Sequence, residues 1–286
     1  MPSLKALRKR IATVRSTQQI TKAMKMVAAA KLRRAQEAAE RARPYSAKLA
    51  EMFTAVAAGV EPEAHPLLAR RAEARIDLLV LTSDRGLCGG YNANLLRFGE
   101  GFVREKGATE SAAVVVGRKG VEYYRRRSGR VVAQRVGILT TAPTTMAAEL
   151  AGEVTRRFVA EETDAVYLVY TRFRSAISQV PTAVPLLPVA PPSIETESPA
   201  VDYIFEPERP ALLARLLPRY VEALITQALL EAIASEHGAR MTAMDNATRN
   251  AGDMIDRLTL SMNRARQATI TKELMEIVSG AEALKG

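Results

Sequence analysis

The residues of this chain that could carry chemistry are few and lie far apart. The two histidines, His65 and His237, are 172 positions apart, and Cys88 is the only cysteine. A zinc site needs several such ligands together, so no ordinary metal site can be assembled from them. The lone cysteine excludes an internal disulfide, which favours the reduced cytoplasmic compartment. Cys88 is expected to be a small buried side chain.

Paired carboxylates and one glycine-rich loop are the remaining candidates. Asp253 with Asp256, and Glu273 with Glu276, have helical spacing, and nothing marks either pair as a general acid and base. The loop Gly86–Gly90 reads G-x-x-G-G, whereas the dinucleotide fingerprint is G-x-G-x-x-G. Its glycines therefore predict a tight backbone turn. The chain has no G-x-x-x-x-G-K-[ST] phosphate loop, and we predict no catalytic residue and no cofactor.

These residues are positioned by a chain whose two ends differ from its middle. All fourteen Phe and Tyr residues lie between Tyr45 and Tyr220, and thirteen of the fourteen prolines lie in nearly the same stretch. Both ends are rich in Ala, Leu, Met, Arg, Glu and Gln, which favour helices. The sequence therefore predicts an N-terminal helix, a central α/β domain and a C-terminal helix that pairs with the first, over 1–60, 74–205 and 210–286.

The N-terminal end carries a seam with alternating steps of three and four. Its positions are Leu4, Leu7, Ile11, Val14, Gln18, Thr21, Lys25, Ala28, Leu32, Ala35, Ala39 and Ala42. The polar part of this seam is expected to be offset by apolar residues on an adjacent face, namely Ile20, Met24 and Val27. Pro44 either kinks the helix or starts a second one.

The C-terminal end repeats the pattern without a charged residue. Its seam is Met241, Met244, Thr248, Ala251, Ile255, Leu258, Met262 and Ala265. Neither helix is stable alone at this length unless its apolar stripe is buried. We therefore expect an antiparallel coiled coil, and the alternative is two independent helices packed on the middle domain. A C-terminal helix from about residue 219 would be the longer partner and would project unpaired.

The middle of the chain alternates short apolar runs with helical patterns, which predicts a Rossmann-like parallel or mixed sheet. The expected strands are Ile76–Leu81, Ala112–Val116, Ala165–Tyr170 and Ser178–Val189. The expected helices are Asn92–Glu105, one that opens at residues 117–120, and Met146–Glu161. The proline-rich stretch Pro188–Pro199 is expected to be a loop.

The net charge of +10 is concentrated in one place. Residues 1–43 hold twelve basic side chains against Glu37 and Glu40, and the remaining residues balance. This basic helix suits a solvated face, an acidic protein partner, or an anionic surface such as nucleic acid or lipid. No apolar run approaches the length of a membrane span, and Met1–Lys5 begins no apolar signal segment, so neither membrane insertion nor secretion is expected.

Three motifs resemble the γ subunits of F-type ATP synthases. Residues 17–35, TQQITKAMKMVAAAKLRRA, resemble that family's N-terminal helix, and residues 82–92, TSDRGLCGGYN, resemble its central loop. Residues 264–283 match its C-terminal signature through Ile270, Thr271, Glu273, Glu276, Gly280 and Ala281. The resemblance runs the length of the chain.

The resemblance implies a non-catalytic rotor subunit in the central stalk of a proton-translocating ATP synthase. Its implied partners are the α and β subunits of the catalytic ring, the ε subunit and the membrane c-ring, with no nucleic acid. It also implies a peripheral position on the cytoplasmic face of a bacterial plasma membrane. The cysteine pair of the chloroplast regulatory insert is absent, because Cys88 stands alone.

The resemblance also implies partner contacts for particular residues. Met24 and Lys25 should lie beside the lower part of the β subunits, and Arg266 and Gln267 should contact an inward loop of the ring. The foot that meets the c-ring is a weaker match, at Tyr203, Phe205 and Glu206. Two other classes stay open from the residues alone: a basic coiled-coil nucleic-acid-binding protein and an enzyme built on the central domain. The absence of aromatics in residues 1–43 weighs against single-strand binding.

Overall fold

In the computed structural model, the description covers residues 3–57, 65–127, 129–190 and 208–283, with side chains up to residue 280. The chain forms two compact units, one of residues 1–27 with 241–286 and one of residues 28–240. The elements in chain order are α1 (Leu4–Ala57), η2 (Pro66–Leu68), β1 (Arg75–Leu81), α2 (Tyr91–Lys106), β2 (Glu110–Val116), α3 (Arg118–Arg125), β3 (Arg130–Arg135), α4 (Pro143–Val159), β4 (Ala165–Phe173), β5 (Gln179–Leu187) and α5 (Arg209–Ala283).

The larger unit contains a five-stranded mixed sheet in the order β3-β2-β1-β4-β5. Strands β1 to β4 are parallel, and β5 runs antiparallel to β4. The predicted α/β class is therefore confirmed, and the central strands are buried along nearly their whole length, as parallel strands covered on both faces must be. Strand β3 was not predicted, because this edge strand is short, half-exposed and flanked by arginines.

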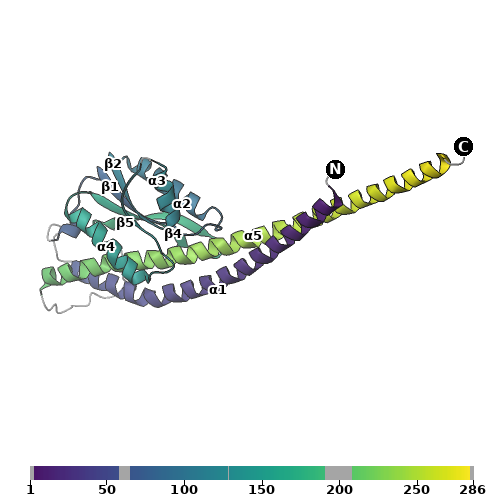
Figure 1. Ribbon diagram of the computed structural model, residues 1–286. Coiled ribbons are helices and arrows are strands. Elements are labelled where there is room, and N and C mark those ends of the chain that lie inside the picture. The colour runs from purple at the N-terminus through teal and green to yellow at the C-terminus, as the bar shows by residue number, and fades with distance from the viewer. Residues whose placement is uncertain (1–2, 58–64, 128, 191–207, 284–286) are drawn as a thin grey trace. The chain divides into compact units, whose positions relative to one another are not determined.

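Helices cover both faces of this sheet (Figure 1). Leu78 and Val80 of β1 pack toward the face that holds α2 and α3, together with Leu95 and Tyr124. The alternate strand residues pack on the opposite face against α4 and the parts of α1 and α5 that belong to this unit. Period-two alternation of side chains in β1 and β2 thus divides the core into two layers.

Both long helices continue through prolines. Helix α1 passes Pro44 without a break. Helix α5 begins at Arg209, next to the start of the predicted segment 210–286, and passes Pro218, whereas the continuous helix was expected only from about residue 219. Proline removes one backbone donor and disfavours a helix interior. Here tertiary packing outweighs that penalty, because the helices bury large side chains beside these positions. The rings of Phe53 and Tyr220 lie 4.8 Å apart, centroid to centroid.

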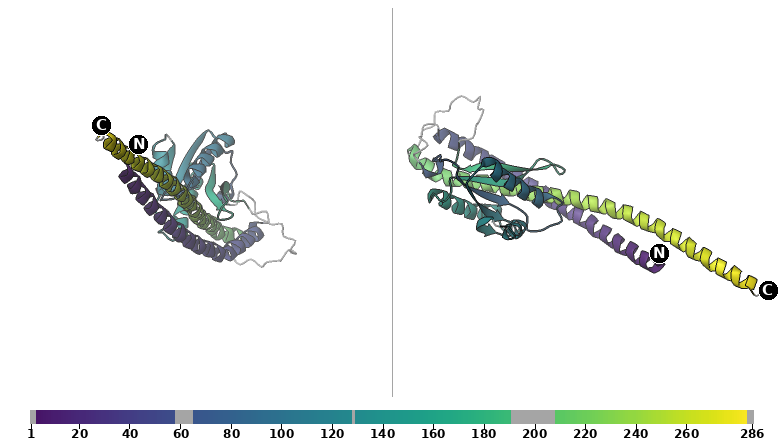
Figure 2. Two further views of the ribbon diagram at one scale, coloured as in Figure 1. Left: turned by 90° about the vertical axis from the view of Figure 1, so that its right-hand side faces the viewer. Right: turned by 90° about the horizontal axis from the view of Figure 1, so that it is seen from above.

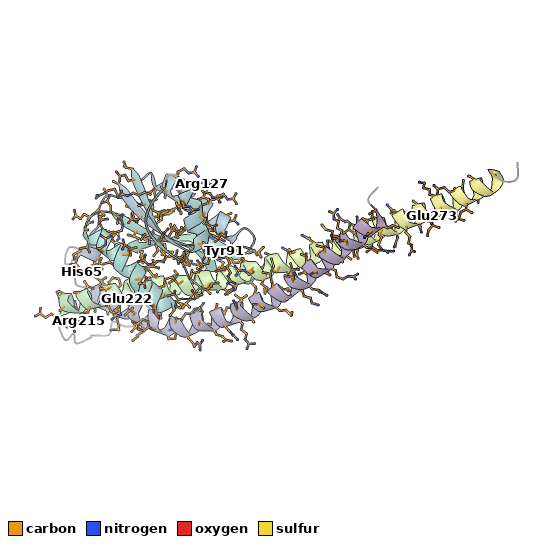
Figure 3. The ribbon with its side chains drawn as sticks, viewed as in Figure 1. His65, Tyr91, Arg127, Arg215, Glu222 and Glu273 are labelled. Atoms are coloured by element: carbon orange, nitrogen blue, oxygen red, sulfur yellow. The ribbon has the colours of Figure 1, made fainter. Side chains whose placement is uncertain are left out.

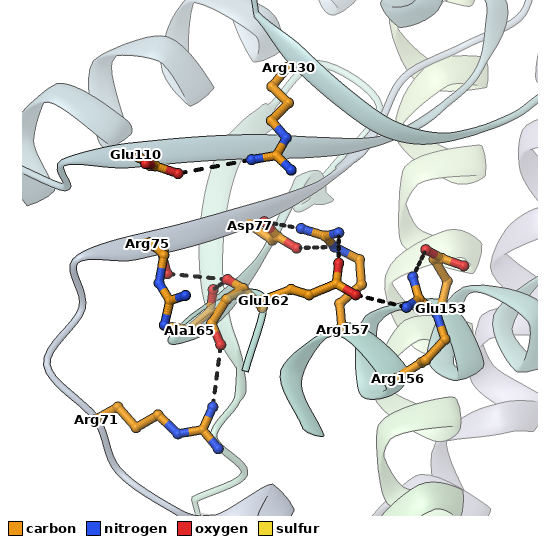
Figure 4. Close-up of polar contacts among 11 residues, drawn as sticks. Arg71, Arg75, Asp77, Glu110, Arg130, Glu153, Arg156, Arg157, Glu162 and Ala165 are labelled. Carbon is orange, nitrogen blue, oxygen red and sulfur yellow. Dashed lines mark hydrogen bonds and ion pairs between the residues drawn. The ribbon is translucent and has the colours of Figure 1, made fainter. Parts of the chain in front are cut away.

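A buried ion pair joins β1 to the end of α4 (Figure 4). Arg157 Nε donates to Asp77 Oδ2 at 2.7 Å, and both residues are at least 96% buried. Arg157 also contacts Glu162, which in turn pairs with the exposed Arg156 at 2.9 Å. Burial raises the pKa of the Asp77 carboxyl even though Arg157 opposes that shift. Each charged group of this pair is therefore buried with the other as its partner of opposite charge.

In the smaller unit, the start of α1 lies beside the C-terminal part of α5 (Figure 2). Residues with lower numbers in α1 contact residues with higher numbers in α5. Lys25 meets Asp245, and Gln18 meets Thr248. The groove beside Leu4 is lined by residues from Ala265 onward. The two stretches are therefore antiparallel, as the seams predicted.

Candidate functional site

The seam of the smaller unit is buried where the three–four alternation places it. Leu7 and Ile11 are 5% and 9% exposed, and Met244 and Ala251 are similarly buried. All other seam positions from Leu4 to Lys25 and from residue 241 to 265 are at least half-buried. The 3.5-residue repeat thus keeps one stripe of each helix against the other.

The polar interruption of this seam is resolved differently from the prediction. Ile20 and Val27 are 57% and 55% exposed, so they do not offset it. Instead, the polar residues pair across the helices. The Gln18 amide donates to the Thr248 carbonyl oxygen at 3.4 Å, and the hydroxyls of Thr21 and Thr248 lie 2.8 Å apart.

One turn further along, Lys25 Nζ lies 2.6 Å from Asp245 Oδ1, and Arg249 lies 2.6 Å from Asp245 Oδ2. The hydrogen bond from Lys25, with the charge of Arg249, holds the pKa of the Asp245 carboxyl below its usual range. Polar groups within an apolar seam specify which residues pair. Met24, which precedes Lys25 in the chain, is half-buried. Lys25 itself forms an ion pair with Asp245 within this chain.

The C-terminal signature lies on a stretch of α5 that is exposed on all sides. Every residue from 266 to 280 is exposed, including Arg266, Gln267 and the Glu273 labelled in Figure 3. Apolar side chains share this exposure: Ile270, Leu274, Met275, Ile277 and Val278 are 48% to 68% exposed. Lys272 and Glu276 form an i,i+4 pair at 3.5 Å. Several exposed apolar side chains close together on one helix indicate an interaction surface.

Of the described signature and contact residues, Glu273 and Glu276 line the open groove beside Leu4, and the others do not line it. The signature residues are exposed and spaced along one helix, namely Ile270, Thr271, Glu273, Glu276 and Gly280. This arrangement is typical of a surface that contacts a partner, whereas catalytic residues converge on one point. The position of Ala281 continues that helix. The foot residues of the resemblance lie outside the described residues: Tyr203, Phe205 and Glu206.

The glycine loop lies in the larger unit, where α5 covers the carboxyl ends of β1 and β4. The Ser235 hydroxyl donates to the carbonyl oxygen of Thr171 at 2.8 Å. The Tyr91 hydroxyl donates to the carbonyl oxygen of Ala232 at 3.1 Å. Tyr91, labelled in Figure 3, thus contacts this helix through its hydroxyl. Open α/β sheets bind ligands at this edge, where the strand order reverses. Here α5 contacts this edge through Ser235, at the carboxyl end of β4.

Arg240 joins the same helix to the loop. Its guanidinium donates to the Gly86 carbonyl oxygen at 3.2 Å and pairs with Glu236 at 2.7 Å. Burial raises the pKa of Glu236, which is 1% exposed, and lowers the pKa of His237 to about 4. This cluster was missed from the sequence, although the Glu-x-x-x-Arg spacing of an i,i+4 pair was readable.

Cys88 is 2% exposed, and burial raises the pKa of its thiol. Burial of this kind favours the neutral thiol over the reactive thiolate. The turn uses a left-handed Gly89, at φ 59°, as the glycine pattern predicted. Within residues 3–57, 65–127, 129–190 and 208–283, no cluster of three or more His, Cys, Asp or Glu could hold a metal.

Across the same described residues, no helix combines the length and hydropathy of a bilayer span.

The N-terminal helix displays its basic side chains to solvent. Arg33, Arg34, Arg41 and Arg43 are exposed. Of these four described residues, only Arg33 pairs with a carboxylate, that of Glu37, at 3.1 Å. This pair links residues of the same helix, so most of the positive charge is free to act on another surface.

Comparison with known proteins identifies one family along the whole chain. The family model described as ATP synthase matches residues 3–284. The ATP synthase gamma chain of Pelotomaculum thermopropionicum is 53% identical over 285 residues, covering 100% of both chains. That of Geotalea daltonii is 50% identical over 289 residues, again covering 100% of both.

Solved structures agree with this result. The central stalk and c-ring of Tetrahymena thermophila mitochondrial ATP synthase contain a chain with a TM-score of 0.61 and 27% identity. The match covers 80% of this chain and 99% of that one. The rotor of the Euglena gracilis mitochondrial enzyme gives a TM-score of 0.65 at 20% identity, over 93% of this chain and 98% of that one, which shows the shared fold.

Proposed function

The chain belongs to the ATP synthase gamma-chain family, and from that premise we propose that it is the central-stalk rotor subunit of a bacterial F-type ATP synthase. In this role it couples rotation of the c-ring to ATP synthesis or hydrolysis in the ring of α and β subunits. It is a non-catalytic part of a rotary ATPase. The observation that carries the proposal is the exposed stretch of α5 after Ala265, whose apolar side chains lack cover within the described chain.

An asymmetric shaft explains how such a subunit can act without an active site. The helical pair presents different side chains around its circumference, so three equivalent β subunits cannot contact it equally. Each β subunit therefore has a different equilibrium between open and closed states, and rotation exchanges these biases. The effect requires differential contact free energy and no chemistry on this chain.

The partner contacts follow the family motifs. We assign Met24 and Lys25 to the lower part of the β subunits, and Arg266 with Gln267 to an inward loop of the ring. The foot toward the ε subunit and the c-ring includes Tyr203, Phe205 and Glu206. The subunit is peripheral at the cytoplasmic face of the plasma membrane, held by its partners.

The basic helix has a place in this arrangement, since it would face acidic surfaces of the ring. The alternative of a nucleic-acid-binding coiled coil is not supported, because the reported relatives are ATP synthase gamma chains.

Affinity purification of this chain from native membranes tests the proposal. A tag on the chain should recover one copy for every three α and three β subunits, with ATPase activity in the eluate. Recovery of nucleic acid, or of the chain without α and β, would contradict it.

A further inference from the structure

A cavity of about 340 Å³ opens in the larger unit between α2, α3 and the sheet, away from the elements assigned to partners. Its base is apolar and is formed by Leu78 of β1, Val103 of α2 and Ala113 of β2. Small-molecule sites have volumes of this order and mostly apolar walls. Space exists here because β2 contributes small residues, Ser111 and Ala113, below the two helices.

The rim of the cavity is cationic. Arg104, Arg127 and Arg130 line it together with a single carboxylate, Glu100. Arg127 lies 3.7 Å from Glu100, and its guanidinium stacks 3.8 Å from the centroid of the Tyr123 ring. That stacking orients the guanidinium and leaves donors for another group.

Arg130 is the most weakly held of these cations. Its guanidinium lies 3.9 Å from Glu110, and its side chain is 68% exposed. Figure 4 marks this pair with a dashed line. A pair at this distance and exposure contributes little. The rim thus offers two or more arginine forks to an anion.

Tyr124 adds an aromatic ring and a hydroxyl to the lining of the cavity. The residue is 9% exposed. Burial raises the pKa of Tyr124 to about 12, so the hydroxyl is a neutral donor at physiological pH.

We propose that this cavity is a binding site for a small organic anion that joins a planar apolar body to a phosphate or carboxylate group. The apolar body lies on Leu78, Val103 and Ala113, and the anionic group lies toward Arg127 and Arg130. The Tyr124 hydroxyl donates to the ligand. Nothing in the rotor role requires such a site, so the proposal stands apart from that role.

The probe is 1-naphthyl phosphate, which has a planar ring and a phosphate dianion and is not a nucleotide. Binding is measured by isothermal titration calorimetry on the full-length chain. The expected result is saturable binding at one site below about 1 mM. R127Q/R130Q should weaken it at least about tenfold, since charge-assisted hydrogen bonds are the stronger kind. S111W, which fills the mouth from an exposed position, should abolish it.

The matched control is R125Q/R126Q, which removes the same amount of charge at the nearby C-terminal end of α3, from exposed residues that do not line the cavity. It should bind like the unaltered chain, and circular dichroism should show all variants folded. Equal weakening in the control, unchanged binding in R127Q/R130Q, or no saturable binding would overturn the proposal. Inorganic phosphate binding as tightly as the probe would overturn the apolar half of the site.

Discussion

The hydroxyls of Thr21 and Thr248 lie 2.8 Å apart across the helical pair, although the two residues are 227 positions apart in the chain. They belong to a short polar part of the seam, together with the hydrogen bond from Gln18 to Thr248 and the bridge from Lys25 to Asp245. A sliding of one helix by a single turn, about 5.4 Å, would separate these groups. The polar contacts therefore define one register where an all-apolar seam would tolerate several.

The first prediction concerns that register. Thr21→Cys with Thr248→Cys, in a Cys88→Ser background, should form a disulfide in high yield on mild oxidation, because the replaced hydroxyls are already close. Gel mobility under non-reducing conditions reports the cross-link. The control is Ala23→Cys with Thr248→Cys, since Ala23 is exposed on the opposite face of α1. Equal cross-linking in both pairs would mean that the register is not defined.

The second prediction concerns the buried pair of Asp77 and Arg157. Arg157→Met should reduce the free energy of unfolding by about 3–5 kcal/mol, because it leaves a buried carboxylate without its partner. Adding Asp77→Asn should restore part of that loss. Urea unfolding of the full-length chain measures both. The neighbouring Arg156→Met is the control and should have little effect, since Arg156 is exposed. Similar losses at both arginines would rule out the special role of the buried pair.

The third prediction concerns pH. His237 is held neutral in the folded chain with a pKa of about 4, whereas the unfolded residue titrates near about 6.5. Its contribution to stability is therefore complete above about pH 6.5 and is lost as the pH falls toward 4, by about 2–3 kcal/mol in all. The charges that face it are Arg240 and Lys31, with Glu236 beside it.

The variant His237→Gln should remove this component. Urea unfolding between pH 7 and pH 4 should show a shallower decline for the variant than for the unaltered chain. Glu236 acts in the opposite direction, since burial raises its pKa, and it is present in both proteins. Parallel stability curves would show that His237 is not buried as a neutral group.

The fourth prediction concerns the basic helix. Neutralising Arg33, Arg34, Arg41 and Arg43 to Gln should weaken association with the α and β subunits and make it less sensitive to salt, because exposed charges act through a screened field. Assembly yield measured from about 50 to 500 mM salt tests this. A control that neutralises four exposed arginines of the central domain should leave the salt dependence unchanged. An unaltered salt dependence in the helix variant would exclude the electrostatic role.

Much of the fold could be predicted because local patterns and tertiary packing agree. The three–four seams and the apolar runs at β1, β2 and β4 identified the coiled coil and the sheet. Strand β3 escaped because its side chains are half-exposed and carry no clear alternation. The segment 210–286 was predicted as the C-terminal helix, but a continuous helix was expected only from about residue 219, because Pro218 argued locally against it. Packing of Leu217 and Val221 stabilises α5 on both sides of that proline.

The functional surfaces were less predictable from the residues alone. The seam showed that Gln18, Thr21 and Lys25 interrupt it, but the partners of polar residues depend on register, which a single sequence does not specify. Ile20 and Val27 were therefore assigned wrongly to the buried face. Arg240 reaches a loop more than 150 positions away, and no local pattern indicates such a contact. The contacts of Arg266 and Gln267 stay predictions, because they depend on a partner.

Single-molecule rotation tests the central claim most directly. The chain, carrying a bead on a cysteine introduced at the exposed Arg125, is assembled with immobilised α and β subunits, with Cys88→Ser to make labelling specific. On addition of ATP, the bead should turn in one direction with three dwells per revolution. Continued ATP hydrolysis while the bead only fluctuates about one position would contradict the assignment of this chain as the rotor.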